Sequence, residues 1–227
     1  MMTTRQNVII PLLAGAGLTF LRFLLRRWTP GGLSYEIASF ILDLALCLLV
    51  LFLFLRHRPS LAEKTPFSFL TCLGVMLLSA GLVRSGIELF HQTGAHDLSG
   101  SWFRIVDLLL LSPVIEEFVY RGLGYGRMRH VLPKWCAALL SSLLFAAGHL
   151  DTGMMVPALL FGLLAALLLE LSGSILWPIV LHILVNTFHL FPSPDRLILM
   201  GIIAAGCVML FISISLYIRH SNDSSRS

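Results

Sequence analysis

The chain has 227 residues, of which 57% are hydrophobic and only 12% are charged, and its mean hydropathy is +0.87. A soluble domain of this length carries about a quarter charged residues, so the composition excludes an ordinary soluble protein. The net charge of +4 comes from basic residues that are scattered among the connections and form no basic face, which excludes nucleic acid as the expected partner.

Eight apolar runs follow one another along the chain, and a helix needs about 20 such residues to cross a bilayer. In chain order the runs are Val8–Leu25, Ile37–Leu55, Phe67–Leu89, Phe103–Leu123, Trp135–Leu150, Met154–Leu171, Ile175–Leu190 and Leu197–Ile218. The fifth and seventh have only 16 residues each, so seven spans are the alternative to eight.

These runs predict an all-α polytopic membrane protein, with about eight transmembrane helices in an irregular bundle around a polar intramembrane cavity. Residues 1–227 are expected to form a single integral membrane domain. The first run has no small-residue cleavage site and carries Arg22 near its end, which favours a retained helix over a signal peptide.

Lys and Arg residues in the short connections predict the orientation, because cytoplasmic loops carry an excess of both. With eight spans and a cytoplasmic N-terminus, the cytoplasmic side receives Arg5, Arg56, Arg58, Lys64, Arg127, Arg129, Lys134, Arg219 and Arg226. The opposite side receives mainly Arg26, Arg27 and Arg196. We therefore predict a multi-pass protein of the cell membrane, with both termini in the cytoplasm and the basic loops against anionic lipid.

Two adjacent carboxylates, Glu116 and Glu117, lie inside the fourth apolar run, where ionisable groups are costly and usually functional. Residues four apart share a helix face, so Glu117 is expected to pair with Arg121. Glu116 points about 100° away round the helix. It is expected to lack an adjacent cation, which makes it a candidate acid or base. The alternative is a satisfied structural network of these three residues.

Two further polar motifs occupy the fifth and seventh runs. Phe145 and His149 are one helical turn apart, as are His182 and Asn186. An imidazole and an amide side by side can donate hydrogen bonds to the oxyanion of a tetrahedral intermediate. The alternatives are a satisfied core histidine for His149 and an interhelical hydrogen-bonding pair for His182 and Asn186.

Other residues at membrane depth have weaker patterns. Pro113 and Pro178 precede the polar residues of their runs and are expected to kink both helices, opening space there or only helping them to pack. Asp43 and Arg84 are expected to pair across helices, and Asp107 lies upstream of Glu116 on a neighbouring face. A structural role is expected for these last three ionisable residues.

The glutamate, the two histidines and the asparagine can together fill every role in the attack of water on an amide. That reaction needs a base for the water, an acid for the leaving amine and donors for the oxyanion. The chain lacks the Gly-x-Ser-x-Gly of serine hydrolases. It also lacks the His-Glu-x-x-His of helical zinc proteases and a Gly-rich phosphate loop. The motifs therefore favour hydrolysis by activated water.

Three strings carry a resemblance to a known family. They are Glu-Glu-Phe-Val-Tyr-Arg-Gly at 116–122, Ser-Ser-Leu-Leu-Phe-Ala-Ala-Gly-His at 141–149 and Leu-Trp-Pro-Ile-Val-Leu-His-Ile-Leu-Val-Asn at 176–186. In order and spacing they resemble the motifs of the CPBP family. That family comprises type II CAAX prenyl endopeptidases and bacteriocin-processing or immunity-linked intramembrane proteases. The similarity covers a family core at residues 101–190 and shows no departure at a motif position.

The resemblance implies a glutamate-type intramembrane endopeptidase. By analogy, Glu116 and His149 activate the water, while His182 and Asn186 stabilise the oxyanion. The residues expected to support this geometry are Glu117, Arg121 and Phe145. No cofactor is favoured. Family members have also been described as metalloproteases, so a divalent metal such as zinc, held by Glu116, His149 and His182, is the alternative.

The expected substrate is a membrane-associated or lipidated protein or peptide, cut near its C-terminus or at a membrane-proximal site. Prenylated CAAX proteins are one such class. The alternatives are a non-catalytic immunity or scaffold protein and, less favoured, a proton-coupled transporter. Access to Glu116 is expected from the cytoplasmic leaflet, on the side of the basic loop 127–134. The sequence does not indicate an oligomeric state.

Overall fold

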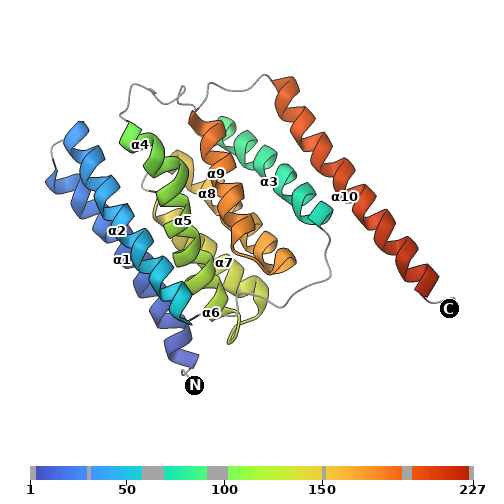
Figure 1. Cartoon of the computed structure of the whole chain (residues 1–227), viewed down its shortest axis with the longest axis horizontal. Coiled ribbons are helices and arrows are strands. Elements are labelled where there is room, and N and C mark those ends of the chain that lie inside the picture. Colours follow the sequence, from blue (N-terminus) through green and yellow to red (C-terminus); the bar gives the residue numbers. More distant parts are fainter. Residues whose placement is uncertain are drawn as a thin grey trace.

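The computed structural model describes residues 4–29, 32–57, 69–90, 102–149, 152–190 and 196–224, and every element in these ranges is helical (Figure 1). The elements are α1 (Thr4–Trp28), α2 (Leu33–His57), α3 (Phe69–Phe90), α4 (Trp102–Val106), η1 (Asp107–Leu111), α5 (Ser112–Glu116), η2 (Glu117–Tyr125), α6 (Gly126–Met128), α7 (Lys134–Ala147), α8 (Thr152–Ser172), α9 (Leu176–Leu190) and α10 (Arg196–Ser224). The π-helical segments η1 and η2 join α4, α5 and α6 into one continuous central helix. The described chain thus has eight helical stretches, one for each predicted apolar run, and the all-α prediction is confirmed.

Successive stretches run in opposite directions, so the start of α1 and the end of α10 lie on the same side of the bundle (Figure 1). Among the described residues, α1, α2, α3, α8 and α10 contain segments long and apolar enough to cross a bilayer, whereas α7 and α9 are apolar but shorter.

Three predicted runs extend beyond the observed helices. The fifth run ends sooner than predicted, because α7 stops at Ala147, and Leu150 lies outside the described residues. Phe67, the predicted start of the third run, also lies outside the described residues. Ile175, the predicted start of the seventh run, belongs to the turn before α9.

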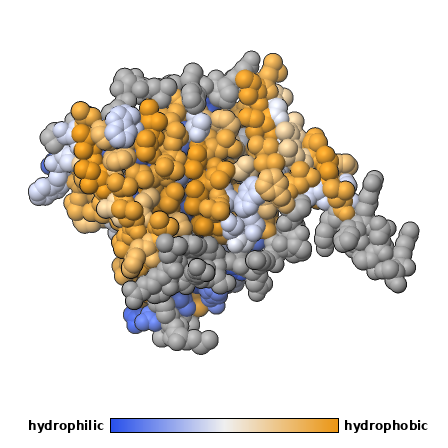
Figure 2. Space-filling model, in the orientation of Figure 1, coloured by the Kyte–Doolittle hydropathy of each residue, from blue (hydrophilic) through white to orange (hydrophobic). Residues whose placement is uncertain are grey.

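The outer helices present large hydrophobic side chains that nothing in the described chain covers. Leu48 and Phe52 of α2 are 61% and 56% exposed, and Phe211 of α10 is 72% exposed. In Figure 2 hydrophobic residues dominate the visible face, and hydrophilic residues lie mainly at its margins. Apolar surface of this extent is stable against lipid rather than water, so the fold is that of a multi-pass membrane protein.

The core lies among α3, α7, α8 and α9, where small residues let the helices approach closely. Ala80 of α3 and Ala165 of α8 are completely buried. A Cβ atom added at Gly162 of α8 would lie 2.7 Å from Cβ of Ser142 on α7. Close approach through small residues is the usual basis of helix packing in membranes.

The central helix is irregular because of Pro113. Proline has no N–H and its ring clashes with the carbonyl four residues earlier. The turn before it widens, and the N–H of Ser112 donates to the carbonyl of Asp107, five residues back. Pro178, in contrast, lies in the first turn of α9, where a missing N–H costs no helical hydrogen bond. The predicted kink at Pro178 is therefore wrong.

Candidate active site

Glu116 is buried midway along the central helix, but the prediction that it lacks a cation is wrong. Nη1 of Arg22 on α1 donates to Oε1 of Glu116, and Nη2 of Arg22 donates to Oδ2 of Asp43 on α2 over 2.7 Å. Ser112 also donates to Oε1 of Glu116, over 2.8 Å. Arg22 lies 94 residues from Glu116 in the sequence, so no local spacing could reveal the pair.

Glu117 faces a different side of the helix and is completely buried with Arg121. Nε of Arg121 lies 3.2 Å from Oε2 of Glu117, which confirms the predicted pair. This contact lacks hydrogen-bond alignment. The guanidinium instead lies over two neighbouring rings, with Cζ 4.5 Å from the centroid of Phe145 and 5.1 Å from that of Phe161. Charge attraction and two cation–π contacts thus compensate for the burial of Arg121.

His182 of α9 lies between the two carboxylates. Its Nδ1 is 2.9 Å from Oε1 of Glu117, and its Nε2 is 3.7 Å from Oε2 of Glu116. A carboxylate at Nδ1 fixes that nitrogen as a protonated one. Nε2 is then the nitrogen that faces Glu116.

The sequence predicted His149 inside the fifth helical run, but it lies just beyond the end of α7. Its Nδ1 is 3.1 Å from the carbonyl oxygen of Phe145, and the centroids of these two rings are 4.7 Å apart. The hydrogen bond and the ring contact hold the imidazole at the end of the helix and leave Nε2 available.

Asn186 is on the same helix as His182, but its amide group is already engaged. Nδ2 donates to the carbonyl oxygen of Leu108 over 2.8 Å. Leu108 belongs to the π-helical segment η1, whose altered hydrogen bonding leaves carbonyls in need of other donors. In this structure Asn186 therefore joins α9 to the central helix.

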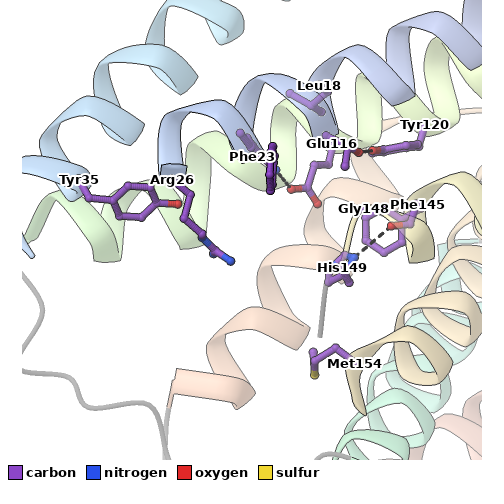
Figure 3. Close-up of a pocket in the computed structure, with 12 residues that line it drawn as sticks. Leu18, Phe23, Arg26, Tyr35, Glu116, Tyr120, Phe145, Gly148, His149 and Met154 are labelled. Atoms are coloured by element: carbon purple, nitrogen blue, oxygen red, sulfur yellow. Dashed lines mark hydrogen bonds and ion pairs between the residues drawn. The ribbon is translucent and has the colours of Figure 1, made fainter. Parts of the chain in front are cut away.

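A cavity of about 280 Å³ opens beside Glu116, between α1, the start of α2, the central helix and the end of α7 (Figure 3). A smaller cavity of about 40 Å³ is lined by His182 and Asn186. His149 and its neighbours Phe145 and Met154 line both cavities. The structure thus places all four predicted catalytic residues beside one of two adjoining cavities.

The larger cavity opens on the side of the bundle opposite to the basic loop 127–134. It extends from Glu116 toward Arg26 at the end of α1, Tyr35 at the start of α2 and His149 at the end of α7. The antiparallel course of the helices places these ends together (Figure 1). The expectation of access from the side of loop 127–134 is therefore wrong, since it relied on closeness to Glu116 along one helix alone.

Arg22 and Asp43 are the site residues that the sequence analysis missed. Asp43 pairs with Arg22 rather than with Arg84, whose Nη2 lies 3.4 Å from Glu88. The predicted pair of Asp43 and Arg84 is therefore wrong. The signal for Arg22 was present, because it is a cation inside an apolar helix, like the carboxylates that were singled out.

The geometry of the histidine side chains is relevant to the metal alternative. Among the residues that the structure describes, no three His, Cys, Asp or Glu side chains gather as metal ligands would. His182 directs Nδ1 to Glu117, and Nδ1 of His149 is next to a backbone carbonyl. Both contacts leave Nε2 as the free ring nitrogen, an arrangement that metal-ligating histidines share, so they do not separate metal-free from metal-dependent catalysis.

The fold and the site define a multi-pass, all-helical membrane protein with a buried glutamate–histidine centre. Residues 98–188 match the family model of the Rce1-like type II CAAX prenyl endopeptidases. This match contains all three motifs and confirms the resemblance to the CPBP family. The matched segment is thus similar to the corresponding segment of CAAX-type intramembrane proteases.

One curated relative is similar over part of the chain. Over 91 residues the protein is 34% identical to an uncharacterized 24.3 kDa protein of Escherichia coli. The aligned part makes up 38% of this chain and 42% of that relative, so the similarity spans less than half of either protein. No solved structure matches the chain.

Proposed function

We propose that this protein is a metal-independent intramembrane endopeptidase, which hydrolyses a peptide bond near the C-terminus or a membrane-proximal site of a membrane-associated or lipidated substrate. The observation that carries the proposal is the convergence of Glu116, Glu117 and His182, with His149 beside Glu116 in the larger cavity. Two buried carboxylates around one imidazole supply acid–base chemistry at membrane depth.

In the proposed mechanism Glu116 and His149 take the proton of the attacking water. Arg22 and Ser112 hold Oε1 of Glu116, so Oε2 is the oxygen directed to the reacting water. Nε2 of His149 has no bond in the described structure and can pass the proton to the leaving amine.

His182 is the proposed oxyanion donor. In the imidazolium form, with Nδ1–H bound to Glu117, the ring donates its Nε2–H toward the place where the oxyanion develops. Asn186 is the proposed second donor, through the N–H of its amide that does not bind the carbonyl of Leu108, and the bond to Leu108 positions α9 against the central helix. Arg121 and Phe145 hold Glu117 in place.

The test is mass spectrometry of protein termini in membranes from cells that express the wild type or Glu116→Gln at matched levels. New termini that appear only with the wild type support the proposal and identify substrates. Glu170→Gln is the matched control, because Glu170 binds Lys134 and Arg129 away from both cavities. Identical termini with a retained phenotype would favour the immunity or scaffold function instead. Retention of cleavage after treatment with a chelator supports metal independence.

We also propose that both termini lie in the cytoplasm, as the distribution of Lys and Arg indicates. The larger cavity then opens toward the opposite side of the membrane. Single cysteines at Arg127 and at Tyr35, in a background without the natural cysteines, test this by labelling with a membrane-impermeant reagent. Labelling of intact cells at position 35 alone is expected, and labelling at position 127 alone would reverse the orientation.

A further inference from the structure

Tyr120 is a polar residue of the larger cavity that the proposed mechanism does not use. It lies on η2, four residues beyond Glu116, and lines the cavity together with Thr19 of α1 and Gly148. Only 4% of the residue is exposed, so most of its ring is held inside the protein. Figure 3 shows the hydroxyl oxygen at the end of the ring nearer to Glu116. The polar end of the side chain is thus the part that meets the cavity.

Close packing fixes the position of this ring. Phe145 meets it edge to face, with the ring centroids 5.3 Å apart. A Cβ atom added at Gly15 of α1 would lie 3.1 Å from Cε1 of Tyr120. A Cβ atom added at Gly148 would lie 3.2 Å from Oγ1 of Thr19 and 3.3 Å from Oη of Tyr120. Both hydroxyls therefore lie against the backbone that immediately precedes the proposed catalytic histidine.

The hydrogen atoms of these two hydroxyls are engaged, but the lone pairs of Tyr120 are not. Thr19 has one O–H, which donates to the carbonyl oxygen of Gly15 over 3.1 Å. The 3.4 Å contact between Thr19 and Tyr120 therefore uses the O–H of Tyr120 as the donor. Among the residues that the structure describes, no group donates to Oη of Tyr120 in return. A hydroxyl oxygen also accepts hydrogen bonds, so a neutral acceptor remains at the wall of the cavity.

We propose that Oη of Tyr120 accepts a hydrogen bond from one backbone N–H of the peptide substrate, so that cleavage requires an N–H at one fixed position beside the cut. This inference rests on the proposed endopeptidase function. A peptide that enters a protein cavity at membrane depth leaves water behind, and each backbone N–H without an acceptor there costs free energy. The cavity therefore has to supply acceptors for the substrate backbone.

The other acceptors beside Glu116 are already committed. Oε1 of Glu116 is held by Arg22 and Ser112. In the proposed mechanism Oε2 of Glu116 and Nε2 of His149 serve the attacking water. Tyr120 thus supplies an acceptor for the substrate without removing a group from the reaction.

The experiment uses the full chain in liposomes and a library of peptides with a hydrophobic anchor and a randomised segment beside it. The peptide that is cleaved fastest, and only when Glu116 is present, becomes the probe. It is remade with each backbone N–H near the cut, except that of the scissile amide, replaced in turn by an ester oxygen. This exchange removes one donor with little change in volume. We expect one position at which the ester lowers kcat/KM about 5- to 10-fold in the wild type, because one hydrogen bond is lost.

Tyr120→Phe should lower kcat/KM for the all-amide probe by the same factor and leave the ester probe of that position unchanged, so the ester penalty disappears. Tyr125→Phe is the matched control, because it removes the other tyrosine hydroxyl of η2, which donates to Glu170 over 2.7 Å away from both cavities. It should keep the ester penalty of the wild type. Thr19→Val should keep it as well, since the acceptor on Tyr120 stays.

An ester penalty that is equal in the wild type and in Tyr120→Phe would overturn the assignment of Tyr120, as would the absence of a penalised position in the wild type. A penalty that is lost in Thr19→Val but kept in Tyr120→Phe would make Thr19 the acceptor and would also overturn it. A hydroxyl that serves structure alone would give Tyr120→Phe a lower Tm in detergent and an equal loss on every probe. Absence of any Glu116-dependent cleavage in the library would instead contradict the endopeptidase function itself.

Discussion

The helices α1 and α10 lie at opposite ends of the chain, and both are long, apolar and outside the matched segment 98–188. Their contributions differ completely. α1 carries Arg22 to Glu116 and forms one wall of the larger cavity. α10 packs mainly on α3, through a hydrogen bond of 2.5 Å between Thr71 and Ser213 and close contact at Gly206. The limits of family similarity therefore do not mark the limits of the site.

The largest expected effect is that of Arg22→Gln. It leaves Glu116 and Asp43 as neighbouring carboxylates without a cation, and breaking such a pair costs about 3 kcal/mol when it is buried. We expect kcat/KM for the identified substrate to fall by at least about 100-fold, together with a lower Tm in detergent. Arg22→Lys separates charge from geometry and should recover part of the activity. Full activity of Arg22→Gln would show that α1 does not serve the site.

A smaller loss is expected for Asp43→Asn. The substitution keeps the volume but removes one of the two carboxylates that hold Arg22, while the bonds of Arg22 to Glu116 and Ser112 stay. We expect about a tenfold fall in kcat/KM, as for the loss of one hydrogen bond to a charged group. If the fall equalled that of Arg22→Gln, Asp43 would have a direct part in the reaction.

On α10, Gly206→Ile should lower stability without lowering the activity of the folded protein. A Cβ atom at Gly206 would lie 2.7 Å from N of Leu78 and 2.9 Å from O of Gly74. Overpacking of this kind costs about 1–3 kcal/mol. Thermal unfolding in detergent and kcat/KM per folded molecule measure the two quantities. Gly201→Ile is the control on the same helix, because its Cβ would meet nothing within 4 Å.

The smallest effect is expected for Phe211→Ala, on the lipid-facing surface of α10. Phe211 is 72% exposed, so the substitution opens no cavity, and both Tm and kcat/KM should stay within error of the wild type. Phe161→Ala is the buried counterpart at 3% exposure, and it removes a ring that contacts Arg121 and His182. A large effect of Phe211→Ala would place a protein partner, rather than lipid, against α10.

The sequence predicted the eight helices because a membrane span has a simple requirement, about 20 apolar residues in a row. It predicted the pair of Glu117 and Arg121 because four residues of helix bring two side chains onto one face. It did not predict the pair of Arg22 and Glu116, since that contact depends on how distant helices pack. The engaged amide of Asn186 was missed for a related reason, because it depends on a π-helical turn that spacing does not disclose.

His149, Phe145 and Met154 lie between the two cavities, since all three line both of them. These side chains therefore form the partition between the compartment of the proposed base and that of the proposed oxyanion donors. A substrate that reaches both compartments has to displace part of this partition. Movement of these few side chains would thus join two small chambers into a single continuous reaction space.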